Sequence, residues 1–553
     1  MFEIDAGPAA NTTFALSCIL VVVLVFTYKL RPPPPQLHPF LLGRQSQASS
    51  TRFEDESPVY SNPNKITTSY LRPDKAVRTL EDVLEGSLTC LEGGQRGSWV
   101  KGGEKITEMV KYIRAGLLSK LGNGSGKVVV AVEDPTDALL VTLALATSSL
   151  RPVVIAPGSS IPDESDIVGI VHSTTRFVSA RGVSANPAAV LVVLGDEDGT
   201  ADDILATGKS VVSEGGEGAQ DSSKAEPSDL ALILISQDIP LEFSHVSLTA
   251  SLVSWLSMFP SSPLPAKPTI KDTIYTFHHP STPYGLGLAL LAISTSASLY
   301  FPQLSTEPSS EEIESLFAAR SAPAATLIFA PSSTLATPLY TVTLQKMIGD
   351  SSFIIRQARN GKIRLLREGS VSKSTIWDKI LFKGLRKELG LHMLRGIFFS
   401  GPLEQGKLET FRCTFGTPAA STLSHPFLLA PLSHGHFYDY QRLPPPGVFR
   451  LTGKEKAHVG PPSAGVEIKL RGSEEEIEKG RIRGEIFIRS PVLPRPQTLP
   501  SPLIYTDDIL PTLPPVPGSK EEEELGKNLS QWLRTGIKAE ISTEGVLWLT
   551  EQQ

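Results

Sequence analysis

The sequence predicts an α/β protein with a small β-rich subdomain near its C-terminal end and one transmembrane helix near its N-terminal end. Short apolar runs alternate with helix-like segments between about residues 76 and 443, and apolar and polar residues alternate with period two after that. No charged residue lies between residues 6 and 28. The chain has 553 residues, 40% of them hydrophobic, and a mean hydropathy of -0.01. This composition excludes a chain that is disordered throughout and a protein with many membrane spans.

Charge and cysteine content narrow the classes of function further. There are 52 Lys and Arg residues against 58 Asp and Glu residues, a net charge of -6 without a large basic block, so we expect no nucleic-acid partner. The three cysteines, Cys18, Cys90 and Cys413, form no CxxC pair. They predict neither a disulfide framework nor a thiolate zinc site, which is typical of a reducing compartment.

Residues 1–31 are predicted to be a membrane anchor. The apolar run over residues 12–28 is close to the minimum length that crosses a hydrocarbon core as a helix. Acidic residues precede it, and Lys29 and Arg31 follow it, which places the N-terminus in the lumen and the body in the cytosol, with the lipid membrane as a partner. A cleaved signal peptide is disfavoured because the start is acidic. The sequence does not end in the peroxisomal signal Ser-Lys-Leu, and the endoplasmic reticulum is the membrane we expect.

Residues 32–75 are predicted to form a spacer and an extended lead-in. The four prolines from Pro32 to Pro35 cannot continue a helix and favour a stiff polyproline segment. The stretch that follows is rich in Ser, Arg, Asn and Pro without sustained periodicity. We therefore expect organised structure to begin near residue 76.

Residues 76–443 are predicted to form the large α/β domain. A strand at 127–132, a helix at 136–149 and a strand at 152–156 make a β-α-β unit of a buried parallel sheet. Apolar runs predict further strands at residues 189–194, 231–235, 273–277, 325–329 and 396–399. Residues 208–229 are polar and rich in Gly and Ser, which predicts a disordered surface loop.

Residues 444–553 are predicted to form the β-rich subdomain. Residues 466–470 and 484–489 alternate with period two, as half-exposed antiparallel strands do. Nine prolines between residues 491 and 517 predict a Pro-rich loop inserted in this subdomain. A last strand is predicted at residues 545–550.

Several motifs that suggest chemistry are disfavoured by their context. Residues 122–127 (GNGSGK) precede a strand instead of joining a strand to a helix, so their backbone amides would not converge on a phosphate. His434 and His436 lie in a loop-like stretch without an obvious further ligand, and no metal site is predicted. No G-x-S-x-G nucleophile elbow is present. His278 and His279 are more informative, because they follow a predicted strand, and ligands collect at strand ends in open α/β sheets.

Several segments, in order along the chain, resemble elements of the adenylate-forming superfamily, and most closely of its long-chain acyl-CoA synthetase branch. They are residues 38–45 (HPFLLGRQ), 376–382 (IWDKILF), 394–403 (LRGIFFSGPL), 458–462 (HVGPP), 483–489 (RGEIFIR) and 532–536 (WLRTG). The later segments are similar to the family's WDK, LSGGAPL, GHVG, RGEI and W-x-x-TGD elements. The resemblance covers residue 36 to the end, and it implies a layered αβαβα large domain of the acyl-CoA synthetase type.

The resemblance also implies a reaction, whose residues this chain largely lacks. Enzymes of that branch activate a fatty acid with ATP and Mg²⁺ and then transfer the acyl group to coenzyme A. Their glycine-rich phosphate loop would follow the strand at 231–235, but residues 236–245 (SQDIPLEFSH) contain neither glycine nor lysine. Phe427 stands where the family has its metal-binding glutamate, and Ile537 stands where it has its ribose-binding aspartate. The chain stops near where the C-terminal lid would begin, so we expect the lid to be absent.

The resemblance implies that the chain keeps the scaffold around an acyl pocket. Five residues match the family's element beside that pocket: His278, His279, Tyr284, Gly285 and Gly287. A glycine-rich turn that packs a helix on the sheet explains the two glycines equally well. Two further residues match a degenerate cofactor-binding element: Thr535 and Gly536. No catalytic residue, metal ligand or cofactor is expected; ATP, Mg²⁺ and coenzyme A belong only to an active enzyme.

Three functions remain open at this point. The first is a membrane-anchored acyl-CoA synthetase-like pseudoenzyme of fatty-acid and lipid metabolism, acting as an acyl-ligand sensor or as an accessory subunit of an active acyl-CoA synthetase or another lipid enzyme. The second is an active long-chain fatty acid-CoA ligase whose site has diverged or is completed by a partner, or whose sequence as given is missing its C-terminal part. The third is a membrane-tethered interaction protein without an acyl ligand.

Overall fold

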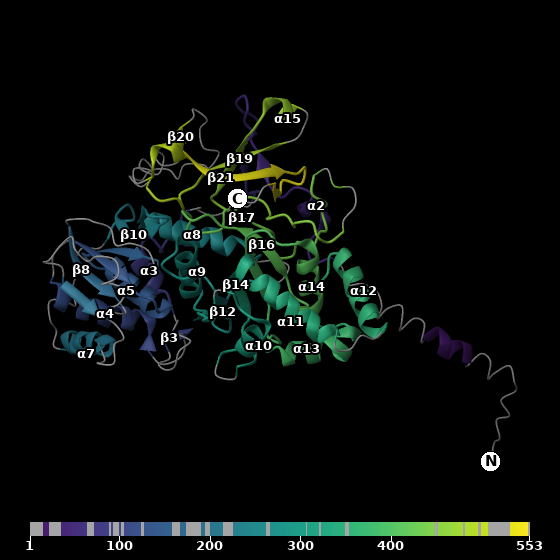
Figure 1. The fold of residues 1–553 in the computed structure, drawn as a ribbon, viewed down its shortest axis with the longest axis horizontal. Coiled ribbons are helices and arrows are strands. Elements are labelled where there is room, and N and C mark those ends of the chain that lie inside the picture. The colour runs from purple at the N-terminus through teal and green to yellow at the C-terminus, as the bar shows by residue number, and fades with distance from the viewer. Residues whose placement is uncertain are drawn as a thin grey trace, which may run out of the picture.

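The structure of the chain is a computed structural model, and three large sheets with their covering helices make up most of its described body (Figure 1). A fourth, two-stranded sheet pairs β3 (Cys90–Leu91) with β5 (Glu104–Lys105). The structure describes residues 15–21, 35–63, 71–87, 90–91, 99–100, 104–122, 126–156, 166–172, 190–193, 200–213, 225–260, 266–305, 307–319, 322–348, 353–446, 448, 452–478, 482–495, 499–506 and 531–550.

The first sheet has six strands in the order β11-β10-β7-β6-β8-β9. Five are parallel, namely β10 (Leu230–Ser236), β7 (Arg151–Ile155), β6 (Lys127–Ala131), β8 (Ile167–His172) and β9 (Val190–Val193). β11 (Ile239–Ser244) closes one edge antiparallel to β10. The predicted β-α-β unit is confirmed, because α5 (Pro135–Ala146) connects β6 to its parallel neighbour β7. Asp134 caps α5 by accepting hydrogen bonds from the backbone N–H groups of Thr136 and Asp137.

Helices α4 (Ile106–Leu121) and α7 (Thr200–Ser213) pack against each other beside this sheet (Figure 1). α7 corrects the predicted loop at 208–229, since residues 208–213 are helical. A Cβ on Gly208 would lie 1.8 Å from the backbone oxygen of Tyr112 in α4, so this glycine lets two helix backbones touch. Gly208 was one of the glycines that led to the prediction of a loop, but in the structure it is a helix-packing residue. Residues 214–224 of that predicted loop lie outside the described residues.

The second sheet has seven strands in the order β17-β16-β15-β14-β12-β13-β4. Its parallel centre contains β16 (Ala419–Leu423), β15 (Gly396–Ser400), β14 (Leu327–Pro331), β12 (Thr273–Thr276) and β13 (Ser298–Tyr300). β17 (Ser433–His434) and β4 (Trp99–Val100) close its two edges antiparallel. The strands predicted at 273–277, 325–329 and 396–399 are thus confirmed, with ends that differ by one or two residues.

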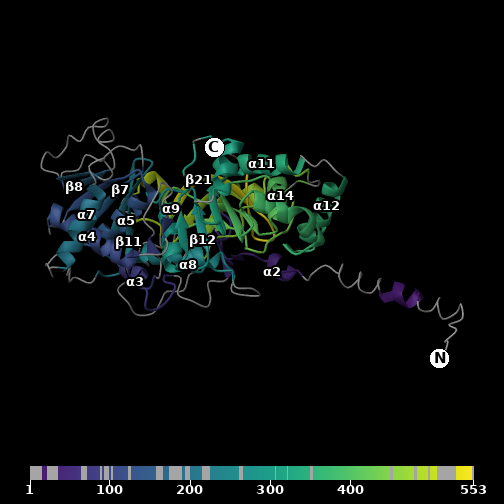
Figure 2. The same cartoon turned by 90° about the horizontal axis from the view of Figure 1, so that it is seen from below.

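Helices α3 (Leu80–Glu85), α8 (His245–Ser257) and α9 (Pro283–Ser294) lie between the first two sheets (Figures 1 and 2). One hydrophobic core contains residues of both sheets and of these helices, for example Leu232, Trp255, Leu288 and Phe329. Five helices cover the opposite face of the second sheet: α10 (Ser310–Ala318), α11 (Thr337–Ile348), α12 (Phe353–Arg367), α13 (Lys383–Glu388) and α14 (Gln405–Phe415). The outer face of the first sheet forms its own apolar cluster, to which no described helix contributes a residue. The described elements therefore show a sheet-helix-sheet-helix arrangement, and the outermost helical layer of the predicted αβαβα architecture is not among them.

The third sheet is the predicted β-rich subdomain, with strands in the order β1-β2-β18-β19-β21-β20 and β22 paired to β21. Its main strands are β18 (Glu467–Arg471), β19 (Arg483–Arg489), β21 (Gln531–Ile541) and β22 (Leu547–Leu549). β1 (Gln47–Ala48) and β2 (Tyr60–Ser61) come from the predicted lead-in, so residues 32–75 contribute to a folded sheet. β20 (Ile504–Thr506) lies within the predicted Pro-rich loop and pairs with β21. β1, β2 and β20 were not predicted, because strands of two or three residues near prolines are too short to show a period-two pattern in the sequence.

Both faces of β18 are buried, which corrects the prediction of a half-exposed strand. Its polar residues Glu467 and Lys469 are shielded from water by ion pairs, with Nε of Arg489 2.5 Å from Glu467 and Nζ of Lys469 2.7 Å from Glu56. The cations of Lys469 and Arg489 also lie 4.6 Å and 4.4 Å from the ring centre of buried Trp532. The alternation of apolar and polar residues predicts that these positions face solvent, but in the structure ion-paired charged residues occupy them inside the protein.

The described N-terminal helical segment, residues 15–21, is drawn apart from the body (Figures 1 and 2). Residues 15–21 are helical and exposed, and the rest of the predicted anchor at 12–28 lies outside the described residues. Among the described residues, no helix combines the length and apolar character that crossing a membrane requires. The body begins at residue 35, followed by α2 (Pro39–Leu42).

Candidate functional site

The predicted pocket element brings His278 and Tyr284 together at the carboxyl ends of three parallel strands. His278 follows β12, and its Nε2 lies 3.2 Å from Oγ of Ser400 at the end of β15. Tyr284 is in the first turn of α9, and its hydroxyl lies 3.2 Å from Oγ1 of Thr422 in β16. The two ring centres are 4.5 Å apart. His278 thus lies at a strand end, the part of an open α/β sheet where ligands collect.

The Tyr284 ring is buried, the His278 ring is half-buried, and both are neutral. Burial lowers the pKa of His278 to about 3, so the imidazole carries no charge at neutral pH. Burial also raises the pKa of the Tyr284 phenol, which therefore stays protonated. These two residues can donate and accept hydrogen bonds but supply no cation for a carboxylate or a phosphate.

His279 does not join the same cluster. Its Nε2 lies 3.2 Å from the backbone oxygen of Glu133, which follows β6 in the first sheet. Its Nδ1 accepts a hydrogen bond from the backbone N–H of Ser281 at 3.2 Å. His279 thus connects the turn before α9 to the other sheet, whereas His278 faces the strand ends.

Aromatic side chains fill the space beside Tyr284. The ring of Trp255, from α8, lies 4.9 Å from that of Tyr284 and 5.7 Å from that of Phe329, both edge to face. Phe329 stacks on Phe398 at 4.8 Å. Trp255, Ser400 and Thr422 were not predicted as site residues from the sequence. Only the positions of Ser400 and Thr422 at the ends of strands could have indicated them.

The two glycines of the pocket element have a packing role. A Cβ on Gly285 would lie 2.1 Å from the backbone oxygen of His279. A Cβ on Gly287 would lie 1.7 Å from the backbone oxygen of Leu429, which accepts a hydrogen bond from Nε1 of Trp255 at 2.9 Å. The glycines therefore allow α9 to approach its neighbours closely, as the alternative explanation had it.

Thr535 and Gly536 lie on β21, close to the end of β16. Oγ1 of Thr535 donates to the backbone oxygen of Ile486 at 2.8 Å, and the N–H of Gly536 donates to Oε1 of Glu485 at 3.0 Å. The backbone of Thr535 lies near the ring of His425, two residues after β16, and favours its protonated form. Burial lowers the pKa of His425 to about 4. The structure therefore brings the degenerate cofactor element near the strand that carries Thr422.

The segment at which the resemblance predicts a phosphate loop is a tight hairpin. β10 and β11 pair up to Ser236 and Ile239, so only Gln237 and Asp238 connect them. Both residues have positive φ, 52° and 60°, as in a two-residue hairpin turn. The position at which the resemblance predicts the metal-binding glutamate is apolar too: Phe427 is buried in the main core, and its ring lies 5.0 Å from that of His425.

A separate groove lies away from this site, beside α2. It has a volume of about 530 Å³ and is lined by residues of the lead-in, of the end of α12 and of residues 440–443, among them Leu37, Leu42, Leu366 and Tyr440. Within the described part of the chain, no group of three or more His, Cys, Asp or Glu residues could hold a metal ion. His434, which had ligand-type neighbours in the sequence, is buried with Nδ1 3.3 Å from the Gly435 oxygen.

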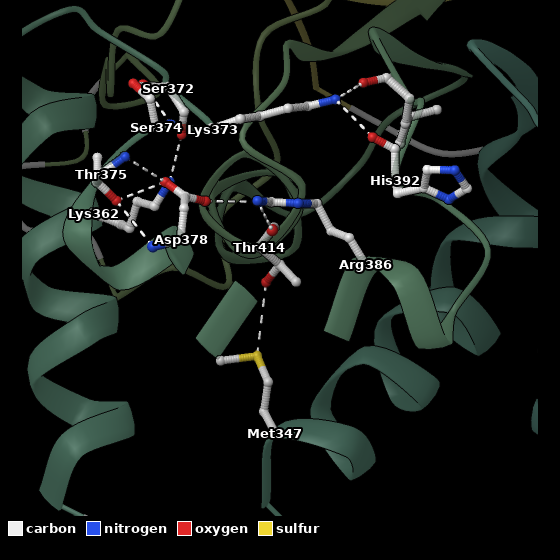
Figure 3. Close-up of polar contacts among 11 residues, drawn as sticks. Met347, Lys362, Ser372, Lys373, Ser374, Thr375, Asp378, Arg386, His392 and Thr414 are labelled. Carbon is white, nitrogen blue, oxygen red and sulfur yellow. Dashed lines mark hydrogen bonds and ion pairs between the residues drawn. The ribbon is translucent and has the colours of Figure 1, made fainter. Parts of the chain in front are cut away.

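The WDK-like segment forms a buried ion cluster (Figure 3). Asp378 begins the short helical turn η4 (Asp378–Phe382) and is ion-paired with Lys362 of α12 and with Arg386 of α13. Nη1 of Arg386 lies 2.7 Å from Oδ1 of Asp378, and Oγ1 of Thr375 lies 2.6 Å from Oδ2. Burial alone would raise the pKa of Asp378, but the hydrogen bonds from Lys362, Thr375 and Arg386 outweigh it and lower that pKa. The cluster fixes η4 and α13 against α12.

Replacing Asp378 with Asn should lower the free energy of unfolding by about 3 kcal/mol, because two buried cations then lack a counter-charge. Urea unfolding of the full chain in mild detergent, followed by tryptophan fluorescence, measures this. The matched control is Glu368→Gln, whose partner Arg364 is 81% exposed, and it should cost less than about 0.5 kcal/mol. Adding Lys362→Met to Asp378→Asn should recover part of the loss. Equal losses in Asp378→Asn and Glu368→Gln would contradict the buried cluster.

Solved structures of adenylate-forming enzymes share this fold. A long-chain-fatty-acid-CoA ligase from Archaeoglobus fulgidus matches with a TM-score of 0.55 at 15% identity, over 87% of this chain and 84% of that chain. The N-terminal domain of FACL13 from Mycobacterium tuberculosis matches with 0.51 at 13% identity, over 81% and 91%. A benzoate CoA ligase from Burkholderia xenovorans matches with 0.50 at 14% identity, over 81% and 74%. No protein-family model and no curated protein sequence matches this chain.

The chain thus has the α/β fold of adenylate-forming enzymes, with the two large sheets of their main domain. At these identities the likeness concerns the fold, and function has to be argued from the residues of the site.

Proposed function

We propose that this protein is a membrane-anchored, catalytically inactive relative of the long-chain acyl-CoA synthetases that acts in lipid metabolism as an accessory subunit or acyl-ligand sensor. The observation that carries the proposal is the hairpin at Gln237 and Asp238. A triphosphate is bound by several backbone N–H groups of a long, glycine-rich loop together with a lysine. A two-residue turn leaves too few free amides, and Asp238 adds a negative charge that repels phosphate.

The residues around the other ATP-contacting positions support the same proposal. Phe427 is buried and apolar and offers no oxygen to Mg²⁺, which takes oxygen ligands almost exclusively. Ile537 cannot accept a hydrogen bond from a ribose hydroxyl. The residues present therefore do not fit ATP and Mg²⁺, and we derive no reaction step through these groups.

The proposal is tested by assaying the full chain in mild detergent with ATP, Mg²⁺, oleate and coenzyme A. We expect neither oleoyl-CoA nor pyrophosphate above the level without protein, while the long-chain-fatty-acid-CoA ligase from Archaeoglobus fulgidus serves as the positive control. Product formation that Gln237→Ala or Asp238→Ala abolishes would contradict inactivity and favour the active-ligase alternative. Activity that requires an added membrane extract would identify a site completed by a partner.

A second candidate, an interaction protein without an acyl ligand, is favoured by the ring packing around Tyr284. Trp255, Tyr284 and Phe329 contact one another where the acyl pocket was predicted. Calorimetric titration of the full chain with oleate and with oleoyl-CoA separates the two functions. Saturable binding that Trp255→Phe alters supports the sensor, and the absence of heat with both ligands supports the interaction protein.

A further inference from the structure

We propose that α12 and the adjoining turn η4 form a docking surface for an anionic lipid bilayer. This α12 surface consists of the exposed cations Arg356, Arg359, Arg364 and Arg367 with the exposed apolar residues Phe353, Ile376 and Ile380. It extends the membrane association of the proposed function, and it does not depend on whether the chain adenylates a substrate. Charge, apolar exposure and position in the molecule each support it.

The charge of α12 is opposite to that of the chain as a whole. The chain has a net charge of -6, but residues 353–367 contain five basic residues and no acidic one. One of the five, Lys362, points inward and pairs with buried Asp378 (Figure 3). Of the four exposed arginines, only Arg364 forms an ion pair between described residues, with Glu368 at 3.3 Å. Guanidinium groups bind phosphate and carboxylate oxygens in two-point geometry, which suits anionic headgroups.

Large apolar side chains accompany these cations. Phe353, Ile376 and Ile380 are 73%, 63% and 64% exposed. Trp377 packs on α12, since a Cβ on Gly361 would lie 2.7 Å from its Nε1, and this contact holds Ile376 and Ile380 beside the helix. Exposed apolar residues next to a basic face are typical of surfaces that insert into the headgroup region of a membrane.

The position of α12 brings it near the predicted anchor. The body of the chain begins beside the end of α12: the N–H of Gln36 donates to the Gly369 oxygen at 3.0 Å, and its Oε1 accepts from the N–H of Val371 at 3.3 Å. Both views show α12 on the side of the body that faces the N-terminal helix (Figures 1 and 2). Residues 29–35 connect the predicted anchor to this point and span at most about 25 Å when extended. α12 itself is about 22 Å long, so the connection keeps its basic face within reach of the bilayer.

The test places an environment-sensitive NBD label on α12 of the full chain, through Asn360→Cys in a Cys18→Ser, Cys90→Ser background that retains buried Cys413. The labelled chain is reconstituted into phosphatidylcholine vesicles with or without 30% phosphatidylserine, which carry a rhodamine lipid. We expect stronger energy transfer and blue-shifted emission with phosphatidylserine, and a decrease of both in 0.5 M salt. The double variant Arg356→Glu, Arg364→Glu should lower the ratio of docked to undocked protein at least tenfold.

The matched control is Lys267→Glu, Lys271→Glu, which changes the total charge equally on the exposed segment before β12 and should leave the transfer unchanged. Transfer that is equal with and without phosphatidylserine, or equal in both double variants, overturns the docking surface. Transfer that rises only when membrane proteins are added assigns the surface to a protein partner and overturns it as well. Flotation of the chain with neutral vesicles tests the anchor separately, so a failed anchor and a failed docking surface are distinguishable.

Discussion

Lowering the pH from 7 to 5 should reduce the free energy of unfolding by several kcal/mol. The reason is a set of histidines that the fold holds neutral. Burial lowers the pKa of His278 to about 3 and the pKa values of three others to about 4: His245, His425 and His434. These four lie on different elements, so their contributions are expected to add.

The sign follows from the protons bound in each state. An unfolded histidine has a pKa near 6.5, so between about pH 6.5 and pH 4 the unfolded chain binds protons that the folded chain excludes. The stability contributed by these rings is complete above about pH 6.5 and is lost as the pH falls. Each group contributes about 1.4 kcal/mol per pH unit in this window, which amounts to about 2 kcal/mol per histidine at pH 5. Asp378 does not contribute to this pH dependence. Because its pKa is lowered in the folded state, the stability that its carboxylate contributes is lost only below about pH 4.

Urea denaturation of the full chain at pH 7, 6 and 5 measures this dependence. His434→Asn should make the slope of stability against pH shallower, whatever it does to stability at pH 7, because one histidine that the fold holds neutral is then absent. A stability that stays constant between pH 7 and pH 5 would mean that water reaches these rings in the folded state.

The strands were largely predictable from the sequence because a buried parallel sheet requires continuous apolar runs. The strands at residues 127–132 and 396–399 needed no information beyond local composition. Elements whose residues serve long-range packing were not predictable in this way. Gly208 looked like a loop residue and is a helix contact, and Glu467 looked exposed and is a buried ion-pair partner.

The candidate site shows the same division between local and long-range information. That His278 follows a strand and that Tyr284 begins a helix are local facts, whereas the contact between the two rings is visible only in the structure. That Trp255 fills the space beside them depends on how α8 lies against α9, which no local pattern encodes. The opposite roles of His278 and His279 likewise depend on which sheet each ring reaches.

Replacing Gly287 with Ala should lower the free energy of unfolding by about 4 kcal/mol, although Ala normally stabilises a helix by about 1 kcal/mol relative to Gly. The added Cβ would lie 1.7 Å from the Leu429 oxygen and 2.7 Å from Nε1 of Trp255, so α9 must move away or the hydrogen bond between those two residues must break. Gly384 is the matched control, because a Cβ there meets nothing within 4 Å, and Gly384→Ala should change stability by less than about 1 kcal/mol. Urea unfolding of both variants measures the difference. If Gly287→Ala proves as stable as Gly384→Ala, α9 does not approach Leu429 this closely and the space beside Tyr284 is open to a ligand.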